Sequence, residues 1–124
     1  MEKLTKLSSE IYAANKAKGF YDKPRENGTT LMLIVSELAE AMEADRGRGN
    51  TLDRNYFERG IQDYPDSFEK FFKENVKDTY EDELADALIR ILDHCGAKNI
   101  DIGWHVEQKL KYNATRARLH GKVY

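Results

Sequence analysis

The sequence predicts an all-α fold, a bundle of four main helices forming a single domain over residues 1–124. Apolar residues recur at helical spacing in four separate stretches, and no stretch shows the alternation typical of a strand. Only two prolines, Pro24 and Pro65, interrupt the chain. Apolar residues make up 40% of the chain and charged residues 34%, a balance that suits a helical domain with a modest core.

The first predicted helix ends at Gly19, a residue type that often follows a helix C-terminus. A linker with Pro24 and Asn27-Gly28 separates it from the second helix. The second helix is expected to begin near Thr29 or Thr30 and to end at Gly47 and Gly49. Its apolar stripe is predicted to face the core and comprises Leu31, Ile34, Val35, Leu38, Ala41 and Met42.

Residues 50–78 form the least regular part of the chain and are interpreted as an insertion between core helices. One short helix is expected after Pro65, with Phe68, Phe71 and Phe72 on one face. Loops of this length are usually functional or disordered.

The third core helix is predicted from about Thr79 to Cys95, with Gly96 ending it. Its apolar stripe comprises Leu84, Ala85, Leu88, Ile91 and Leu92. Asp101 is expected to cap a fourth helix that ends before Gly121.

Two pairs of acidic residues, each spaced by three, lie on the second and third predicted helices. Glu37 and Glu40 share one side of their helix, as do Glu83 and Asp86. If these sides meet, four carboxylates converge and raise one another's pKa values unless a cation neutralises them. Mg²⁺ prefers such oxygen ligands, and helical bundles build metal sites from acids on facing helices. The alternative for each pair is a solvated helix surface.

The fourth helix carries Lys109, Tyr112, Asn113 and Arg116 on one face, and Lys122 follows it. Lysine and arginine suit phosphate oxygens, and asparagine can bind phosphate, ribose or base. The alternative is a basic helix end favoured by the helix dipole.

The overall composition excludes several classes of protein. A net charge of −2 gives no basic surplus for nucleic-acid binding. No apolar stretch reaches the roughly 20 residues that span a bilayer, and the N-terminus lacks the apolar run of a signal peptide. The single cysteine, Cys95, cannot form an internal disulfide, so a reducing cytoplasm is expected.

Several of these segments together resemble the MazG-like, all-α nucleoside triphosphate pyrophosphohydrolases. The signature of this family is E-x-x-E followed, after a variable gap, by E-x-x-D. The matching segments are S-E-L-A-E (36–40), E-D-E-L-A-D-A-L-I-R-I-L-D (81–93), K-L-K-Y-N-A-T-R-A-R-L-H-G-K (109–122) and K-G-F-Y-D (18–22). The gap between the acidic motifs is longer than in compact members because residues 50–78 are inserted.

The resemblance implies Mg²⁺-dependent hydrolysis of an NTP or dNTP to the monophosphate and pyrophosphate, in nucleotide-pool house-cleaning, with Mn²⁺ as the substitute ion. It implies Glu37, Glu40, Glu83 and Asp86 as metal ligands and catalytic residues. It also implies a homodimer or homotetramer. The residues expected to contact substrate are Lys109, Asn113, Arg116 and Lys122, with Phe20, Tyr21, Asp22 and Tyr112 as weaker candidates.

Three alternatives remain open from the sequence. The chain is a non-catalytic nucleotide-sensing or partner-binding module of the same fold, a phosphoribosyl-ATP pyrophosphohydrolase, or a structural bundle whose acids are solvated. The sequence fixes neither base and sugar preference nor the number of metal ions.

Overall fold

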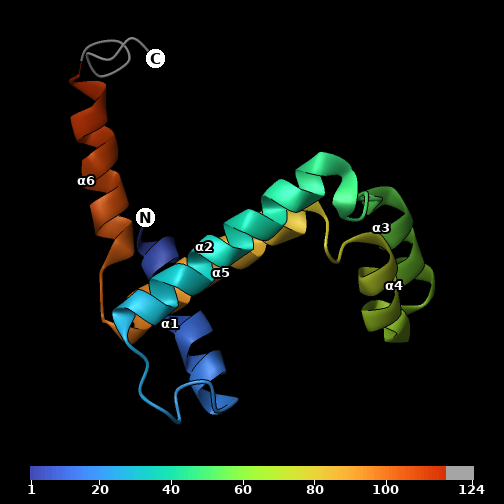
Figure 1. The fold of residues 1–124 in the computed structure, drawn as a ribbon, viewed down its shortest axis with the longest axis horizontal. Coiled ribbons are helices and arrows are strands. Elements are labelled where there is room, and N and C mark those ends of the chain that lie inside the picture. Colours follow the sequence, from blue (N-terminus) through green and yellow to red (C-terminus); the bar gives the residue numbers. More distant parts are fainter. Residues whose placement is uncertain (117–124) are drawn as a thin grey trace. The chain divides into compact units, whose positions relative to one another are not determined.

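The structure, a computed structural model, describes residues 1–116. Helices dominate this range (Figure 1): α1 (Glu2–Ala17), α2 (Asn27–Glu43), α3 (Arg54–Asp63), α4 (Phe68–Asn75), α5 (Tyr80–Ala97) and α6 (Ile102–Ala114). A π-helical turn, η1 (Ala44–Arg48), follows α2, and a 3-10 turn, η2 (Pro65–Ser67), precedes α4. Residues 1–116 contain no strand, apart from one isolated bridge between Asn50 and Thr79. The predicted all-α class is confirmed.

The chain forms two compact units, and their boundary lies within α5, between Arg90 and Ile91. The first unit contains α1, the end of α5 and α6, and the second contains residues 25–90. The two acidic motifs lie in the second unit, whereas the basic face of α6 lies in the first. The assignment of one domain to residues 1–124 stays a prediction.

In the first unit, the start of α1 packs against the start of α6. The Thr5 hydroxyl donates to Asp101 Oδ1 at 2.7 Å and accepts from the Gly103 backbone N–H at 2.9 Å. Asp101 Oδ1 also accepts from the Trp104 N–H at 3.2 Å, which confirms the predicted cap of α6. This network fixes the beginning of α6 to the N-terminal helix.

Glycines confirm one predicted helix end and correct another. Gly19 follows α1 with φ +89°, a left-handed conformation that glycine adopts readily. Gly96 does not end the third core helix, because α5 continues to Ala97. A Cβ atom at Gly96 would lie 2.6 Å from the Ser8 carbonyl oxygen, so this glycine permits a close approach of α1.

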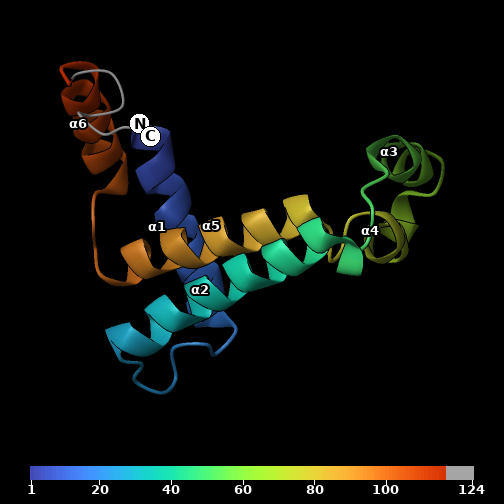
Figure 2. The ribbon, with the colours of Figure 1, turned by 45° about the horizontal axis from the view of Figure 1, so that its top comes forward.

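In the second unit, α2 and the first part of α5 lie side by side and run antiparallel (Figures 1 and 2). Glu37 of α2 pairs with Arg90 of α5, whereas Glu40, later in α2, interacts with Glu83, earlier in α5. The two helices therefore run in opposite directions. The two acidic motifs therefore face each other across one helix–helix contact.

The apolar side of α2 consists of two stripes rather than one. The buried stripe contains Thr30, Ile34, Glu37 and Ala41. The stripe one residue further on is exposed and contains Leu31, Val35, Leu38 and Met42. Both follow the same helical spacing. The expectation that all the apolar residues of α2 face the core is wrong for this second stripe.

The same correction applies to part of the predicted stripe of α5, because Leu84, Leu88 and Ile91 are exposed. Leu92 is buried as predicted, together with Ala87 and Cys95. Six of the exposed apolar side chains that these helices carry in the second unit have 42% to 54% of their surface accessible. We call them the outer apolar face: Leu31, Val35, Leu38, Met42, Leu84 and Leu88.

The inserted segment is more ordered than the sequence predicted, because it contains two helices instead of one. The second, α4, corresponds to the expected helix after Pro65. The first, α3, begins at Asp53, whose side chain accepts from the Tyr56 N–H at 3.1 Å. α3 and α4 pack as a helical hairpin (Figures 1 and 2).

Aromatic rings fill the hairpin. Phe57 meets Phe68 and Phe72 edge-on, at centroid distances of 5.7 and 6.1 Å. Phe71 is buried against Gly60, where a Cβ atom would lie 2.5 Å from the ring. The hairpin thus has an apolar core of its own.

The two ends of the insertion meet where the hairpin joins the core helices. The Asn50 N–H donates to the Asp78 carbonyl at 3.1 Å, and its side-chain amide donates to the Lys77 carbonyl at 2.9 Å. The Asp53 N–H donates to the Asn75 carbonyl at 3.1 Å. These bonds attach the hairpin to the second unit at one point.

Candidate functional site: an acidic cluster between two helices

The start of α5 is fixed by its own side chains. Thr79 is fully buried, and its hydroxyl oxygen accepts from the Asp82 N–H at 3.1 Å. Asp82 in turn accepts from the Asp78 N–H at 3.1 Å through Oδ2. This reciprocal capping sets the register in which Glu83 and Asp86 face α2.

Three of the four predicted acids converge closely. Carboxylate oxygens of Glu37, Glu83 and Asp86 all lie within 4.8 Å of one another. We call these three residues the acidic cluster. Glu37 and Glu83 are buried, and Asp86 is half-buried. Glu40, the fourth predicted acid, is exposed and influences the cluster through its contact with Glu83.

Two carboxyl groups of the acidic cluster have raised pKa values. Burial and then the nearby carboxylates of Glu40, Asp86 and Glu37 raise the pKa of Glu83 to about 7. Burial also raises the pKa of Asp86, with Asp82 and Glu37 adding to the effect and Arg90 opposing it. Without a cation, the protein therefore retains a proton on these groups at a pH at which free carboxyls have lost it.

The donor set suits a hard divalent cation. Glu83 Oε2 is buried and has no hydrogen-bond partner among the described residues, an unusual state for a buried carboxylate oxygen. Oxygen ligands of Mg²⁺ lie about 2.1 Å from the ion, so opposite ligands are about 4.2 Å apart. The three carboxylate oxygens, all within 4.8 Å of one another, are close to that spacing. The acidic cluster could therefore hold a metal ion.

A second acidic grouping shares Glu83 with the cluster. Asp78, Asp82 and Glu83 also offer oxygens within 4.8 Å of one another. Asp82 already accepts a backbone hydrogen bond there as part of the α5 cap. Asp78 and Asp82 were not predicted as site residues, although their position shortly before Glu83 in the sequence could have indicated them.

Arg90 is a site residue that the sequence analysis did not assign. Its Nε donates to Glu37 Oε1 at 2.8 Å, across the contact between the two helices. Its position four residues after Asp86, on the same face of α5, was the available signal. Arg90 brings a positive charge to the edge of the acidic cluster.

The predicted substrate-binding residues of α6 lie in the first unit. Lys109 Nζ and the Arg116 guanidinium lie 5.3 and 5.5 Å from the centre of the Tyr112 ring. Asn113 is half-buried, and its Oδ1 has no hydrogen-bond partner among residues 1–116. Lys122 lies outside the described residues. Two positively charged side chains therefore lie over the ring of Tyr112.

The weaker candidates near the end of α1 differ in their surroundings. Tyr21 packs edge-on against Tyr12, with ring centroids 4.9 Å apart. Phe20 is exposed, and Asp22 lies next to Gly19. An exposed ring is available for stacking on a base, whereas Tyr21 also has a packing role.

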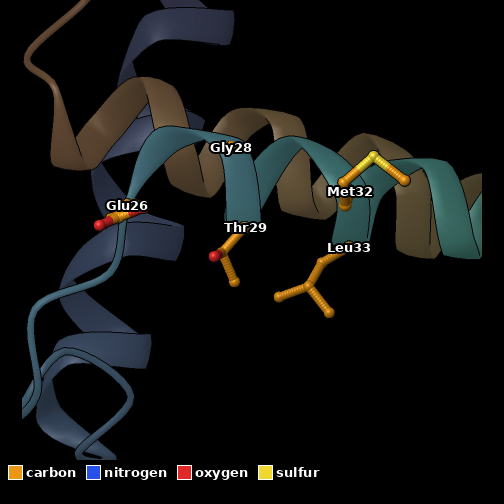
Figure 3. A pocket seen from close by; sticks show the side chains of 5 residues that line it. All are labelled: Glu26, Gly28, Thr29, Met32 and Leu33. Carbon is orange, nitrogen blue, oxygen red and sulfur yellow. The ribbon is translucent and has the colours of Figure 1, made fainter.

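Two hollows lie elsewhere in the second unit. One, of about 500 Å³, is at the start of α2 and is lined by Glu26, Gly28, Thr29, Met32 and Leu33 (Figure 3). The side chains of Thr29 and Leu33 point to the same side of the helix there. The other, of about 120 Å³, lies on the α3–α4 hairpin beside Tyr56, Tyr64 and Phe71. Neither hollow is lined by a residue of the acidic cluster.

Comparisons with models of protein families, with curated proteins and with solved structures each found no match to this chain. Among residues 1–116, no helix has both the length and the apolar character needed to cross a membrane.

Proposed function

We propose that the protein is a Mg²⁺-dependent nucleoside triphosphate pyrophosphohydrolase with a MazG-like four-helix core. The observation that carries this proposal is the convergence of Glu37, Glu83 and Asp86, with an unpartnered buried oxygen on Glu83. The resemblance of the acidic and C-terminal motifs to MazG-like enzymes supports the same activity.

The proposed reaction breaks the bond between the α-phosphorus and the oxygen bridging to the β-phosphate. Water adds to the α-phosphorus, and pyrophosphate leaves with the bridging oxygen. Mg²⁺, when bound, would supply positive charge for the triphosphate and would lower the pKa of the attacking water. Glu37, Glu83 and Asp86 would hold the ion, and Glu40, which is exposed beside Glu83, would orient or deprotonate the attacking water.

The chain also offers candidates for binding the nucleotide itself. Lys109 and Arg116 supply positive charge for phosphate oxygens, and the free Oδ1 of Asn113 accepts a hydrogen bond from base or sugar. Phe20 provides an exposed ring for stacking.

We further propose that the protein assembles as a homo-oligomer through the outer apolar face. Six apolar side chains on two adjacent helices form this face. Exposed apolar patches of this kind mark interaction sites in soluble proteins. A second copy presents an identical face, so a two-fold axis would bury both.

The reaction is tested with a panel of canonical and damaged NTPs and dNTPs, with phosphoribosyl-ATP included. Each is incubated with protein and Mg²⁺, and the products are resolved to distinguish pyrophosphate from orthophosphate. Pyrophosphate release that requires the metal is expected. Orthophosphate alone would contradict the proposed reaction, and binding without turnover would indicate the non-catalytic nucleotide-sensing module.

Amide variants test the role of the acids. Asp86→Asn and Glu40→Gln keep side-chain volume and remove one charge, so the metal-free fold should be unharmed or stabilised. Turnover should fall by about 100-fold or more, which corresponds to about 2.7 kcal/mol of transition-state stabilisation. Glu81→Gln, an exposed acid on the same helix, is the matched control and should retain full turnover. Unchanged turnover in Asp86→Asn would remove that residue from the site.

A further inference from the structure

Arg90 is placed between the acidic cluster and solvent. Its side chain is 38% exposed, whereas that of its partner Glu37 is 11% exposed. Among residues 1–116, this is the ion pair that reaches the cluster, since the other pairs join side chains on the surface. A guanidinium in this position can reach both the carboxylates and a ligand arriving from solvent.

The Arg90–Glu37 contact uses only part of the guanidinium. The Nε donates to Glu37 at 2.8 Å, and neither Nη group donates to a described residue. An arginine has five N–H donors in a fixed fork that matches carboxylate and phosphate oxygens. Most of the donor capacity of Arg90 is therefore not used by any residue within 1–116.

The charges around Arg90 favour an exchange of partners. Three carboxyl groups lie together beside one guanidinium, and a divalent cation would bind them in their ionised, net negative form. A cation that binds Glu37 competes directly with Arg90 for the same carboxylate. Once displaced, the guanidinium is half-exposed, charged and adjacent to the ion, which is where the phosphates of a metal-bound nucleotide would lie.

We infer that Arg90 is a positioning residue with two successive partners: Glu37 in the cation-free protein, and a phosphate of the substrate once a divalent cation occupies the acidic cluster. This inference rests on the proposed function, because it requires both the cation and a phosphate ligand. It assigns the phosphate contact nearest the metal to a residue of the second unit, which contains the acidic cluster itself.

If Arg90 exchanges partners in this way, replacing it should change the affinities for Mn²⁺ and for pyrophosphate in opposite directions. Arg90→Met removes a competing positive charge, so the nucleotide-free protein should bind Mn²⁺ several-fold more tightly, as measured by calorimetry. With Mn²⁺ saturating, the same variant should bind pyrophosphate about 10- to 100-fold more weakly, because a charge-assisted hydrogen bond is lost. Arg90→Lys keeps the charge without the fork, so its effects on both affinities should be smaller.

Arg54→Met is the matched control, because Arg54 also pairs with a glutamate through its Nε, at 2.7 Å to Glu58, but on the surface of the hairpin. It should change neither affinity. Parallel weakening of Mn²⁺ and pyrophosphate binding in Arg90→Met would show that Arg90 only supports the fold locally and would overturn the inference. Unchanged pyrophosphate affinity would overturn it too. A parent protein that binds no divalent cation would instead refute the proposed function, and the inference with it.

Discussion

The two helix pairs of the second unit are stabilised in different ways. The contact between α3 and α4 is filled by aromatic rings, with Phe71 buried against Gly60. The contact between α2 and α5 contains Glu37 and Glu83 at positions where a core would ordinarily place apolar residues. Apolar burial stabilises the first pair under most conditions, whereas the second pair depends on the charge state of its carboxylates. The difference supports the proposal that the α2–α5 contact holds a metal ion.

The largest expected effect is a loss of hairpin stability that leaves metal binding at the acidic cluster unchanged. Phe71→Ala removes a buried ring, so the hairpin should lose about 3–5 kcal/mol of stability. Hydrogen exchange of the α3 and α4 amides measures this loss. Mn²⁺ affinity at the acidic cluster should stay unchanged, because no hairpin residue contributes to it.

Phe68→Ala is the control for this prediction, because Phe68 is more than half exposed and should cost less. If Phe71→Ala weakened Mn²⁺ binding in parallel with hairpin stability, the two helix pairs would not be independent.

The second effect is the pH dependence of the α2–α5 contact. Folding raises the pKa of Glu83 from 4.5 to about 7, so the folded state holds a proton that the unfolded state has lost. The contribution of Glu83 to stability is therefore complete below pH 4.5 and is lost as pH rises through about 7. The loss is at most about 3 kcal/mol, and urea unfolding across this range measures it.

Two comparisons make the pH experiment specific. Glu83→Gln should flatten this part of the pH profile, because the amide does not titrate. A divalent cation should reverse the slope in the parent, because it binds the ionised carboxylates. A profile that is identical in parent and variant would mean that Glu83 does not titrate as described.

The smallest effect on folding concerns the outer apolar face. Leu38→Glu replaces an exposed leucine, so the stability of the isolated chain should change by about 0.5 kcal/mol or less. Light scattering should nevertheless show a change from oligomer to monomer, because assembly would bury a charged glutamate in an apolar interface. Leu38→Met, which keeps the face apolar, should remain oligomeric. A parent that is monomeric at micromolar concentration with full activity would contradict the proposed assembly.

Local rules predicted three helix ends but not the start of α2, which begins at Asn27 instead of near Thr29 or Thr30. Gly19 after α1, Thr79 before α5 and Asp101 before α6 each act through contacts within a few residues. Gly96 could not be read correctly in this way, because its role is set by α1, far away in the sequence. α3 was missed because it is short and its aromatic residues gain their packing only from α4.

The acidic cluster could also be predicted from local spacing in the sequence. Residues spaced by three or four share a helix face, so each acidic pair could be recognised separately. Which apolar stripe of α2 is buried could not be deduced, because both stripes have the same spacing and lie one residue apart. The ion pair of Arg90 joins residues 53 positions apart, and only the packing of the two helices creates it.

The hydrogen bonds that the backbone and the side chain of Asn50 donate to the Lys77–Asp78 segment make the insertion a separable module. The chain leaves and returns at the same place, so a short turn could replace residues 51–77 without stretching the core helices. Closing a shorter loop carries a smaller entropic cost, and surface segments of this kind tolerate large changes in length. The hairpin is consequently free to diverge, shrink or carry a fused domain, while Thr79 continues to start α5 in the register that the carboxylates require.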